Sequence, residues 1–382
     1  MEFRDLKSQY KKMQLEMDKA VLEVLSEGNY IMGRQVAELE KELADYVGVK
    51  HCISCANGTD ALQLVLMAWG IGDGDAVFIP DFTFFATGEV VSLESATPIF
   101  VDVEKKTFNI DPEKLEKRIK KVIKEGKLSP RVIITVDLFG CPADYERIEE
   151  IANKYDLLLL EDGAQGFGGS IKGKMVCSFG DASTTSFFPA KPLGCYGDGG
   201  AIFTDDDDLA ELIRSYRIHG KGKDKYDNVR IGLNSRLDTV QAAILQVKFK
   251  AFKDYELKEV DTVARKYTER LKDVVIVPSI PEGYHSCWAQ YTIVLPNKEK
   301  RDGLQEYLKQ KSIPSNIYYI KPMHQQGAFS YLGNKNVEDL EVTKDLCDRV
   351  LSLPIHPYLT DEEIKVVAGE VEFFLNRGEE DA

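Results

Sequence analysis

The sequence predicts an α/β protein with a large domain around a mostly parallel sheet and a smaller α+β carboxy-terminal domain. From about residue 50 to 205, short apolar runs alternate with amphipathic stretches, as in βα units that feed a parallel sheet. After about residue 235 this alternation ends and a long helical stretch begins. A chain of 382 residues that is 43% hydrophobic is also long enough for two cores.

The elements expected in the large domain follow from length and periodicity. The candidate strands are His51–Cys55, Ala76–Ile79, Pro98–Val101, Val132–Val136, Leu157–Glu161, Ala182–Phe187 and Ala201–Thr204. The candidate helices between them are Thr59–Trp69, Thr83–Leu93, Pro112–Lys124 and Asp144–Lys154. Several of these helices open with Asp, Thr or Pro, which suit the free N–H groups of a first turn.

The carboxy-terminal part has a different pattern. Leu237–Lys272 is predicted to be one long helix, followed by an aromatic strand near Tyr284–Val294 and a helix at Arg301–Lys311. We therefore divide the chain into a large domain, residues 1–250, and a small domain, residues 251–382. The change of pattern alone sets this boundary, because no linker or repeat marks it.

The composition narrows the class of protein. Lys and Arg number 49 against 63 Asp and Glu, and the net charge of −14 would repel a nucleic acid backbone. The amino terminus lacks the apolar core of a signal peptide, and no segment reaches the roughly 18 apolar residues that span a bilayer. Seven scattered cysteines are typical of reduced thiols. We expect a cytoplasmic protein without a nucleic acid or membrane partner.

The strongest local signal is a lysine at the end of a predicted strand. Lys191 lies in SFFPAKPLGCYGDGG, residues 186–200, where glycines follow it directly. A lysine that is desolvated at a strand exit loses its proton and becomes an amine nucleophile toward an aldehyde. A lone loop lysine is more often simply solvated, so this interpretation depends on the motifs around it.

A second signal is the apolar run that ends in Glu161 and Asp162. Such a run is typical of a buried parallel strand whose carboxyl end faces a ligand crevice. Asp162 would then pair with the ring nitrogen of a pyridine cofactor, and Gln165 would contact the ring hydroxyl. Taken alone, Asp162 is equally well explained as a helix cap or turn carboxylate.

Two further segments suit a phosphorylated, planar ligand. Residues 57–60, Asn-Gly-Thr-Asp, join the first strand to its helix, so Gly58, Thr59 and Asp60 offer a phosphate seat at a helix start. Simple helix capping explains the same residues. Ser186 could add a hydroxyl, and Phe84 could stack on a ring, although core packing is the more common role of such an aromatic residue.

Two alternative sites are less consistent with the sequence. The glycines at positions 70–74 follow a helix and precede a strand, the reverse of the dinucleotide fingerprint. Cys52 and Cys55 form a single pair on a probable buried strand, whereas a zinc site needs four ligands. We expect no metal site and no nicotinamide cofactor.

Taken together, these motifs resemble the DegT/DnrJ/EryC1/StrS sugar aminotransferases. These are pyridoxal 5'-phosphate (PLP) enzymes of fold type I, the aspartate aminotransferase fold, that aminate nucleotide-linked keto sugars for surface polysaccharides and related glycans. The resemblance extends over FRDLKSQY (residues 3–10), NYIMG (29–33), NGTDAL (57–62), EDGAQ (161–165), the Lys191 segment and GLNSRLD (232–238).

The resemblance implies a role for each matching residue. Lys191 would form the Schiff base with PLP and shuttle the proton, Asp162 would pair with the pyridine nitrogen, and Gln165 and Phe84 would contact the ring. The phosphate would be held by Gly58, Thr59, Asp60 and Ser186, and by Asn234 of a neighbouring subunit in a homodimer with shared sites. Glutamate would be the amino donor.

Within the family, the Lys191 segment is most similar to enzymes acting on UDP-2-acetamido sugars oxidised at C3, of the 3-oxo-glucuronate type. Arg236 would contact an acidic or phosphorylated part of that substrate, and Tyr318, Tyr319 and His324 would lie in the sugar-recognition segment. Because Tyr318 stands where this subgroup has histidine, a 4-oxo sugar nucleotide stays an alternative.

Two alternatives of another kind concern catalysis itself. Members of the family with histidine in place of the lysine are dehydratases, and Lys191 argues against that outcome. A non-catalytic sugar-nucleotide binding or regulatory protein would be expected to lose Lys191 or Asp162, and both are present.

Overall fold

The computed structural model describes residues 1–224, 226–333 and 338–380. The helices are α1 (Leu6–Lys12), α2 (Gln14–Glu27), α3 (Arg34–Val47), α4 (Gly58–Ala68), α5 (Ala86–Leu93), α6 (Pro112–Glu125), α7 (Tyr145–Tyr155), α8 (Asp207–Tyr216), α9 (Thr239–Ala251), α10 (Leu257–Leu271), α11 (Lys298–Gln310), α12 (Glu341–Arg349) and α13 (Asp361–Glu380). The strands are β1 (His51–Cys55), β2 (Asp75–Pro80), β3 (Thr97–Val101), β4 (Ser129–Val136), β5 (Leu158–Asp162), β6 (Ser170–Ile171), β7 (Lys174–Met175), β8 (Ala182–Ser186), β9 (Gly200–Thr204), β10 (Tyr284–His285), β11 (Tyr291–Val294) and β12 (Val350–Leu353). None of these helices is long and apolar enough to cross a lipid bilayer.

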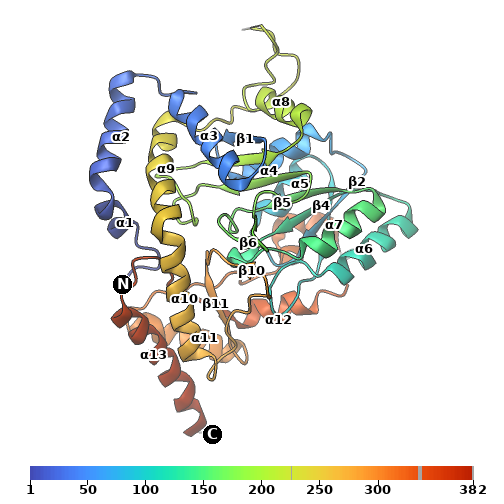
Figure 1. The fold of residues 1–382 in the computed structure, drawn as a ribbon. Helices are drawn as coiled ribbons and strands as arrows, with labels where there is room; N and C mark the ends of the chain where they lie inside the picture. Colours follow the sequence, from blue (N-terminus) through green and yellow to red (C-terminus); the bar gives the residue numbers. More distant parts are fainter. Residues whose placement is uncertain (225, 334–337, 381–382) are drawn as a thin grey trace.

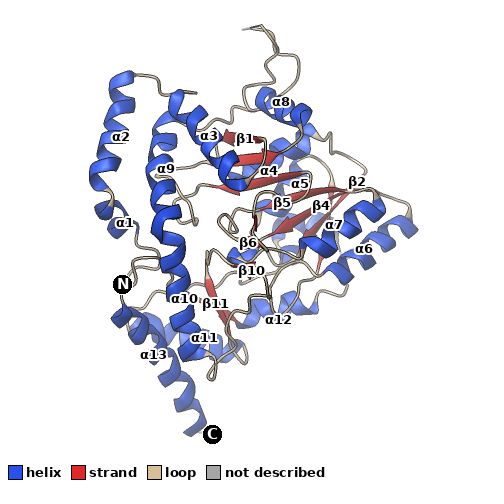
Figure 2. Ribbon diagram, in the orientation of Figure 1, coloured by secondary structure: helices blue, strands red, loops and turns tan. Residues whose placement is uncertain are grey.

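A seven-stranded sheet lies at the centre of the fold (Figure 2). Its strand order is β1-β9-β8-β5-β4-β2-β3, and β9 alone runs antiparallel to its neighbours. The remaining six strands therefore point the same way and end at one edge. The predicted mostly parallel sheet and fold type I architecture are confirmed.

Helices cover both faces of this sheet, because alternate residues of each strand pack in opposite directions. On β2, Val77 and Ile79 pack with α4, α5 and α8, whereas Ala76 and Phe78 pack with α6 and α7. Another cluster joins β1 and β9 to α3 and α9. Figure 1 shows α1 and α2 outside this layer, along α9.

A separate core cluster lies in the carboxy-terminal part. It contains side chains of α10, α11, α13, β11 and β12, from Val260 to Val371. The helix leading into it, predicted as one element over 237–272, runs from α9 to α10 through a π turn at Phe252–Glu256. The division at residue 250 stays a prediction.

Two predicted elements differ from the structure. The strand expected over Tyr284–Val294 was wrong as a single element, since β10 pairs with β6 and β11 pairs with β12. The chain turns between them at Trp288, whose φ is 53°, where it packs closely against Gly140. The helix expected from Thr83 begins at Ala86, because the preceding residues run as a loop past the end of β2.

Phe249 tests the aromatic part of the core. Its ring lies 5.2 Å from that of Tyr46 and 6.3 Å from that of Phe167, and the side chain is fully buried. Phe249→Ala should lower the free energy of unfolding by about 3–5 kcal/mol, since a large cavity replaces the ring. Urea denaturation measures the change, with the half-exposed Ile123→Ala as control, for which we expect a loss under about 1 kcal/mol. Equal losses would contradict this packing.

Candidate active site

The candidate site forms where parallel strands of the sheet end. Asn57 follows β1, Asp81 follows β2, Asp162 ends β5 and Ser186 ends β8. Since these strands point the same way, their last residues meet at one edge, which is where open α/β sheets bind ligands. The loop after β8 carries Lys191 to this edge.

Lys191 is held in a tight turn beside this edge. Its amide donates to the carbonyl of Phe188 at 2.9 Å. Burial lowers the pKa of its ε-amino group, and the carboxylate of Asp162 opposes this shift. The side chain therefore has the electrostatics of an amine that can act as a nucleophile or a proton carrier.

Asp162 is buried and is held at both carboxylate oxygens. Oδ1 accepts from the amide of Ala164 at 3.2 Å, and Oδ2 accepts from the hydroxyl of Thr87 at 3.0 Å, which in turn lies 3.1 Å from that of Thr83. Burial raises the pKa of Asp162, while the charge of Lys191 and these hydrogen bonds oppose the rise. Asp162 and Lys191 are thus electrostatically coupled.

A hydrogen bond between Gln165 and Tyr319 links the loop after β5 to the segment that contains Tyr318 and Tyr319. The side-chain amide of Gln165 donates to the hydroxyl of Tyr319 at 3.0 Å and accepts from the amide of Phe139 at 3.0 Å. The ring of Phe84 is 55% exposed and lies 6.5 Å from that of Tyr319. An exposed aromatic ring near Tyr319, the partner of Gln165, can stack on a planar ligand.

The start of α4 has the shape of a phosphate seat. Asn57 caps the helix by accepting from the amide of Asp60 at 2.8 Å. Among the described residues, the amides of Gly58 and Thr59 have no acceptor. A Cβ at Gly58 would lie 2.8 Å from the Cβ of Ser186, so only glycine lets the helix start approach that strand end. Two free amides and a serine hydroxyl suit a phosphate.

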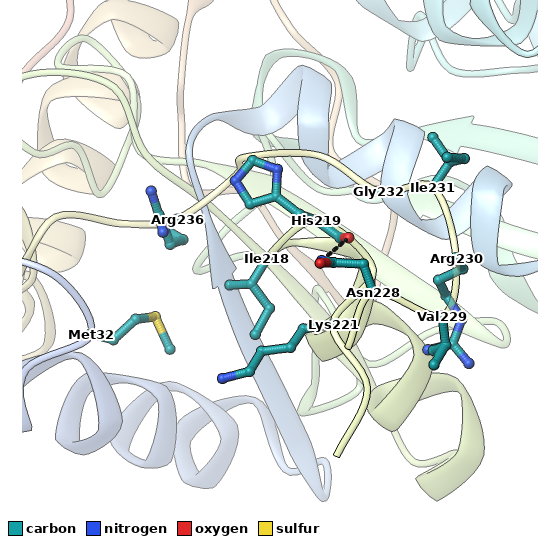
Figure 3. Close-up of a pocket in the computed structure, with 10 residues that line it drawn as sticks. All are labelled: Met32, Ile218, His219, Lys221, Asn228, Val229, Arg230, Ile231, Gly232 and Arg236. Atoms are coloured by element: carbon teal, nitrogen blue, oxygen red, sulfur yellow. Dashed lines mark hydrogen bonds between the residues drawn. The ribbon is translucent and has the colours of Figure 1, made fainter. Parts of the chain in front are cut away.

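Asn234 and Arg236 flank Ser235, whose hydroxyl accepts from the amide of Ala56 at 3.1 Å. No hydrogen bond or ion pair between them and Lys191, Asp162 or Gln165 occurs in the part of the chain that the structure describes. Arg236 lines an open pocket of ≈ 1070 Å³, and Figure 3 shows it with Met32 on one side of the pocket and Val229 with Arg230 on the other. The remaining lining residues are Ile218, His219, Lys221, Asn228, Ile231 and Gly232.

His324 and Tyr318, two of the predicted substrate contacts, each contact another side chain of the protein. The imidazole Nδ1 of His324 lies 2.6 Å from Oδ2 of Asp81, and its side chain is only 5% exposed. Burial raises the pKa of Asp81, and His324 opposes this. The ring of Tyr318 lies 6.3 Å from that of Phe3. Contact of His324 and Tyr318 with a substrate stays a prediction.

Two buried acids, Glu161 and Asp137, lie next to Asp162, since Glu161 precedes it on β5 and the amide of Asp137 donates to its carbonyl. Glu161 accepts from the amides of Cys177 and Phe179 and from the hydroxyl of Ser183, at 2.7, 2.9 and 2.7 Å. Asp137 accepts at Oδ1, while its Oδ2 has no donor among the described residues. Burial and the neighbouring Glu161 raise the pKa of Asp137, so we infer that it is protonated and donates to Glu161.

Sequence reasoning missed the residues that hold the predicted ones in place. Thr87 and Thr83 are separated by four positions, the spacing that puts two side chains on one face of a helical turn, but threonine is too common for that to indicate a site. Asp137 follows β4 as Asp162 ends β5, and that strand-end position was an available signal.

Comparison with known proteins identifies the family to which the chain is similar. The model of the DegT/DnrJ/EryC1/StrS aminotransferase family matches residues 11–372. The UDP-2-acetamido-2-deoxy-3-oxo-D-glucuronate aminotransferase of Pseudomonas aeruginosa is 45% identical over 96% of this chain and 98% of its own. A pleiotropic regulatory protein of Geobacillus stearothermophilus is 41% identical over 97% of each chain. The crystal structure of a DegT DnrJ EryC1 StrS aminotransferase from Brucella abortus is 50% identical, with a TM-score of 0.94 over 98% of this chain and 99% of that one.

The buried acid pair predicts a pH dependence of stability. The folded protein keeps a proton that the unfolded chain releases above about pH 4.5, so the free energy of unfolding falls as the pH rises from there. Asp137→Asn replaces the proton donor by an amide, and its stability should fall less steeply, by about 1.4 kcal/mol per pH unit for the one proton removed. Urea denaturation between about pH 5 and 8 measures this, with the exposed Asp73→Asn as control. Equal slopes for wild type and Asp137→Asn would rule out the shared proton.

Proposed function

Because the chain belongs to the DegT/DnrJ/EryC1/StrS aminotransferase family, we propose that it transfers the amino group of glutamate to a UDP-linked 2-acetamido-3-oxo sugar. The observation that carries this proposal is the electrostatic coupling of Lys191 and Asp162, in a site that also has a phosphate seat at Gly58 and the exposed ring of Phe84. Family members depend on PLP. The product would be an amino sugar nucleotide for the synthesis of surface glycans.

The residues present fit the cofactor. The amides of Gly58 and Thr59 with the hydroxyl of Ser186 would hold its phosphate, and Gly58 leaves no side chain in that space. Asp162 would face its ring nitrogen, and Phe84 would lie against the ring. When bound, PLP supplies a ring that accepts the electrons released when a Cα–H bond breaks.

The chain's own groups would then manage the proton. Burial favours the neutral amine of Lys191, which can take a proton from the donor carbon and return one to the acceptor carbon. Thr87 and the amide of Ala164 keep Asp162 in one orientation, in which its charge would pair with the ring nitrogen of bound PLP. Gln165 is fixed by Phe139 and Tyr319 and would orient the ring oxygen. The overall exchange converts glutamate and a keto sugar into 2-oxoglutarate and an amino sugar.

The charge of the pocket in Figure 3 supports an anionic substrate. His219, Lys221, Arg230 and Arg236 all line it, although the protein as a whole has a net charge of −14. A diphosphate or a sugar carboxylate would be attracted to such a local basic cluster. We assign the diphosphate of the UDP group to this pocket, with Arg236 as its first contact.

The position of Asn234 supports a shared site in a homodimer. Its side chain is exposed, and apolar side chains of the same loop and of the turn before α3 are exposed as well, among them Ile231, Met32 and Ile31. Apolar surface of this kind is typical of an interface between subunits. We infer that Asn234 of one subunit completes the phosphate seat of its partner. We place the protein in the cytoplasm, where its free, buried cysteines stay reduced.

A second candidate function is sugar-nucleotide binding without catalysis, because one relative is named a pleiotropic regulatory protein. Such a protein has no need of a lysine whose pKa is lowered by burial beside a carboxylate. The reaction test that follows distinguishes the two functions.

The absorption spectrum of the protein with PLP tests the proposed reaction. Glutamate should remove the band of lysine-bound PLP, and a UDP-linked 3-oxo sugar should restore it. Restoration by a 4-oxo sugar alone would overturn the proposed keto position. Lys191→Ala should lower kcat by about 10²–10⁴-fold or more, since nucleophile and proton carrier are both lost. The exposed Lys50→Ala serves as control, and a near wild-type rate for Lys191→Ala would favour the binding protein.

Mixing two inactive variants tests the shared site. Lys191→Ala and Asn234→Ala are each expected to be impaired, the second through weaker PLP binding by about 10-fold or more. If the site combines Lys191 of one subunit with Asn234 of the other, each mixed dimer contains one intact site. Random mixing should then restore about one quarter of the wild-type rate at limiting PLP. A rate equal to the sum of the two variants alone would place both residues in one subunit's site.

A further inference from the structure

We propose that Arg4 is a positioning residue for Lys191 and that the amino-terminal arm, residues 3–5, forms part of the active-site wall. This inference rests on the proposed role of Lys191. The arm precedes α1 and is far from the lysine in sequence, yet it contacts both the lysine loop and the segment of Tyr318 and Tyr319.

The contact with the lysine loop is made by the guanidinium of Arg4. Its Nη2 donates to the main-chain carbonyl of Lys191 at 3.0 Å and to that of Pro192 at 3.4 Å. The amide of Lys191 is held on the other side by Phe188. The main chain of Lys191 is therefore fixed at both its N–H and its C=O, which limits where the side chain can point.

The arm itself is anchored at several points. Asp5 caps α1 by accepting from the amide of Ser8 at 2.9 Å and from its hydroxyl at 2.6 Å. Gln9, one turn later, is buried and donates to Glu256 at 2.8 Å. Met13 and Met17 continue this contact by packing with side chains of α9. Arg4 is thus presented to Lys191 by a docked helix rather than by a loose terminus.

A buried carboxylate opposite the arm balances its charge. Glu256 ends the π turn, is 3% exposed, and also accepts a hydrogen bond from the hydroxyl of Tyr358. Burial lowers the pKa of Arg4, and the charge of Glu256 is the first to oppose this. π turns are costly and are retained mostly at functional sites. Here the turn directs Glu256 toward the arm.

Arg4 also acts on Lys191 through charge. The groups that face the ε-amine from the surrounding elements are Asp162, which raises its pKa, Cys287, which raises it, and Arg4, which lowers it. Removing the charge of Arg4 would raise the pKa of Lys191 and leave less neutral amine at neutral pH.

The second contact of the arm is with the predicted sugar-recognition segment. Phe3 packs on Tyr318, whose ring lies 5.8 Å from that of Tyr319, and Tyr319 accepts from Gln165. The arm therefore joins the lysine loop to the opposite wall of the crevice. A shift of the arm would move both.

Competitive acetylation of the cofactor-free protein, read by peptide mass spectrometry over about pH 6–10, gives the titration midpoint of Lys191. Arg4→Met should raise this midpoint so that about 3–10-fold less neutral amine remains at pH 7. Arg4→Gln, which keeps hydrogen bonding without charge, should also raise it, and Arg4→Lys should leave it near the wild-type value. Lys7→Met is the matched control, because Lys7 is a basic residue just beyond the arm, in the first turn of α1, with its side chain 85% exposed.

The outcomes separate this inference from the proposed function. An unchanged midpoint in both Arg4→Gln and Arg4→Met, or an equal shift in Lys7→Met, would overturn the role of Arg4. If Arg4→Met fails to fold, as judged by its Tm, the comparison of Arg4→Lys with Arg4→Gln decides. With PLP bound, Arg4→Met and Arg4→Gln should lose kcat while KM for glutamate changes little. Because the labelling needs neither PLP nor substrate, its result holds even if the sugar substrate is wrongly assigned.

Discussion

The buried pair of Asp162 and Lys191 constrains the rest of the site. Each charge would be costly in this crevice alone, and each moderates the effect of burial on the other. Hydrogen bonds from neighbouring residues fix the positions of these two residues. Thr87 and Ala164 hold the carboxylate, while Phe188 and Arg4 hold the main chain of the lysine. The common edge of six co-directed strands is where these four contacts come together.

Much of this could be predicted from the sequence, for a physical reason. The strands of the central sheet are short, most of them are apolar, and amphipathic helices follow several of them, so periodicity located all seven to within a few residues. Asp162 and Ser186 end strands, Gln165 and Lys191 lie in the loops that follow, and a parallel sheet brings strand ends together. Their expected neighbourhood therefore agrees with the structure, while their roles toward PLP stay proposals.

What the sequence could not indicate are contacts between distant segments. The hydrogen bond from Arg4 to Lys191 and the packing of Phe3 on Tyr318 depend on tertiary docking that no local pattern encodes. The break at Trp288 had the same origin, because the close approach of Gly140 turns a stretch whose composition favours a strand. The raised pKa of Asp137 likewise arises only once its carboxyl is buried beside Glu161.

The π turn between α9 and α10 also limits how the chain can change length during evolution. Each residue added to or removed from a helix rotates everything beyond it by about 100°. The turn lies between two core clusters, one that packs α9 on the sheet and one that packs α10 on β11 and β12. The buried face of each helix therefore already has fixed packing partners. Losing one residue there would turn Glu256 away from the arm and α10 away from its partners. Insertions and deletions should therefore accumulate in the loops of this lineage and be purged from residues 239–271.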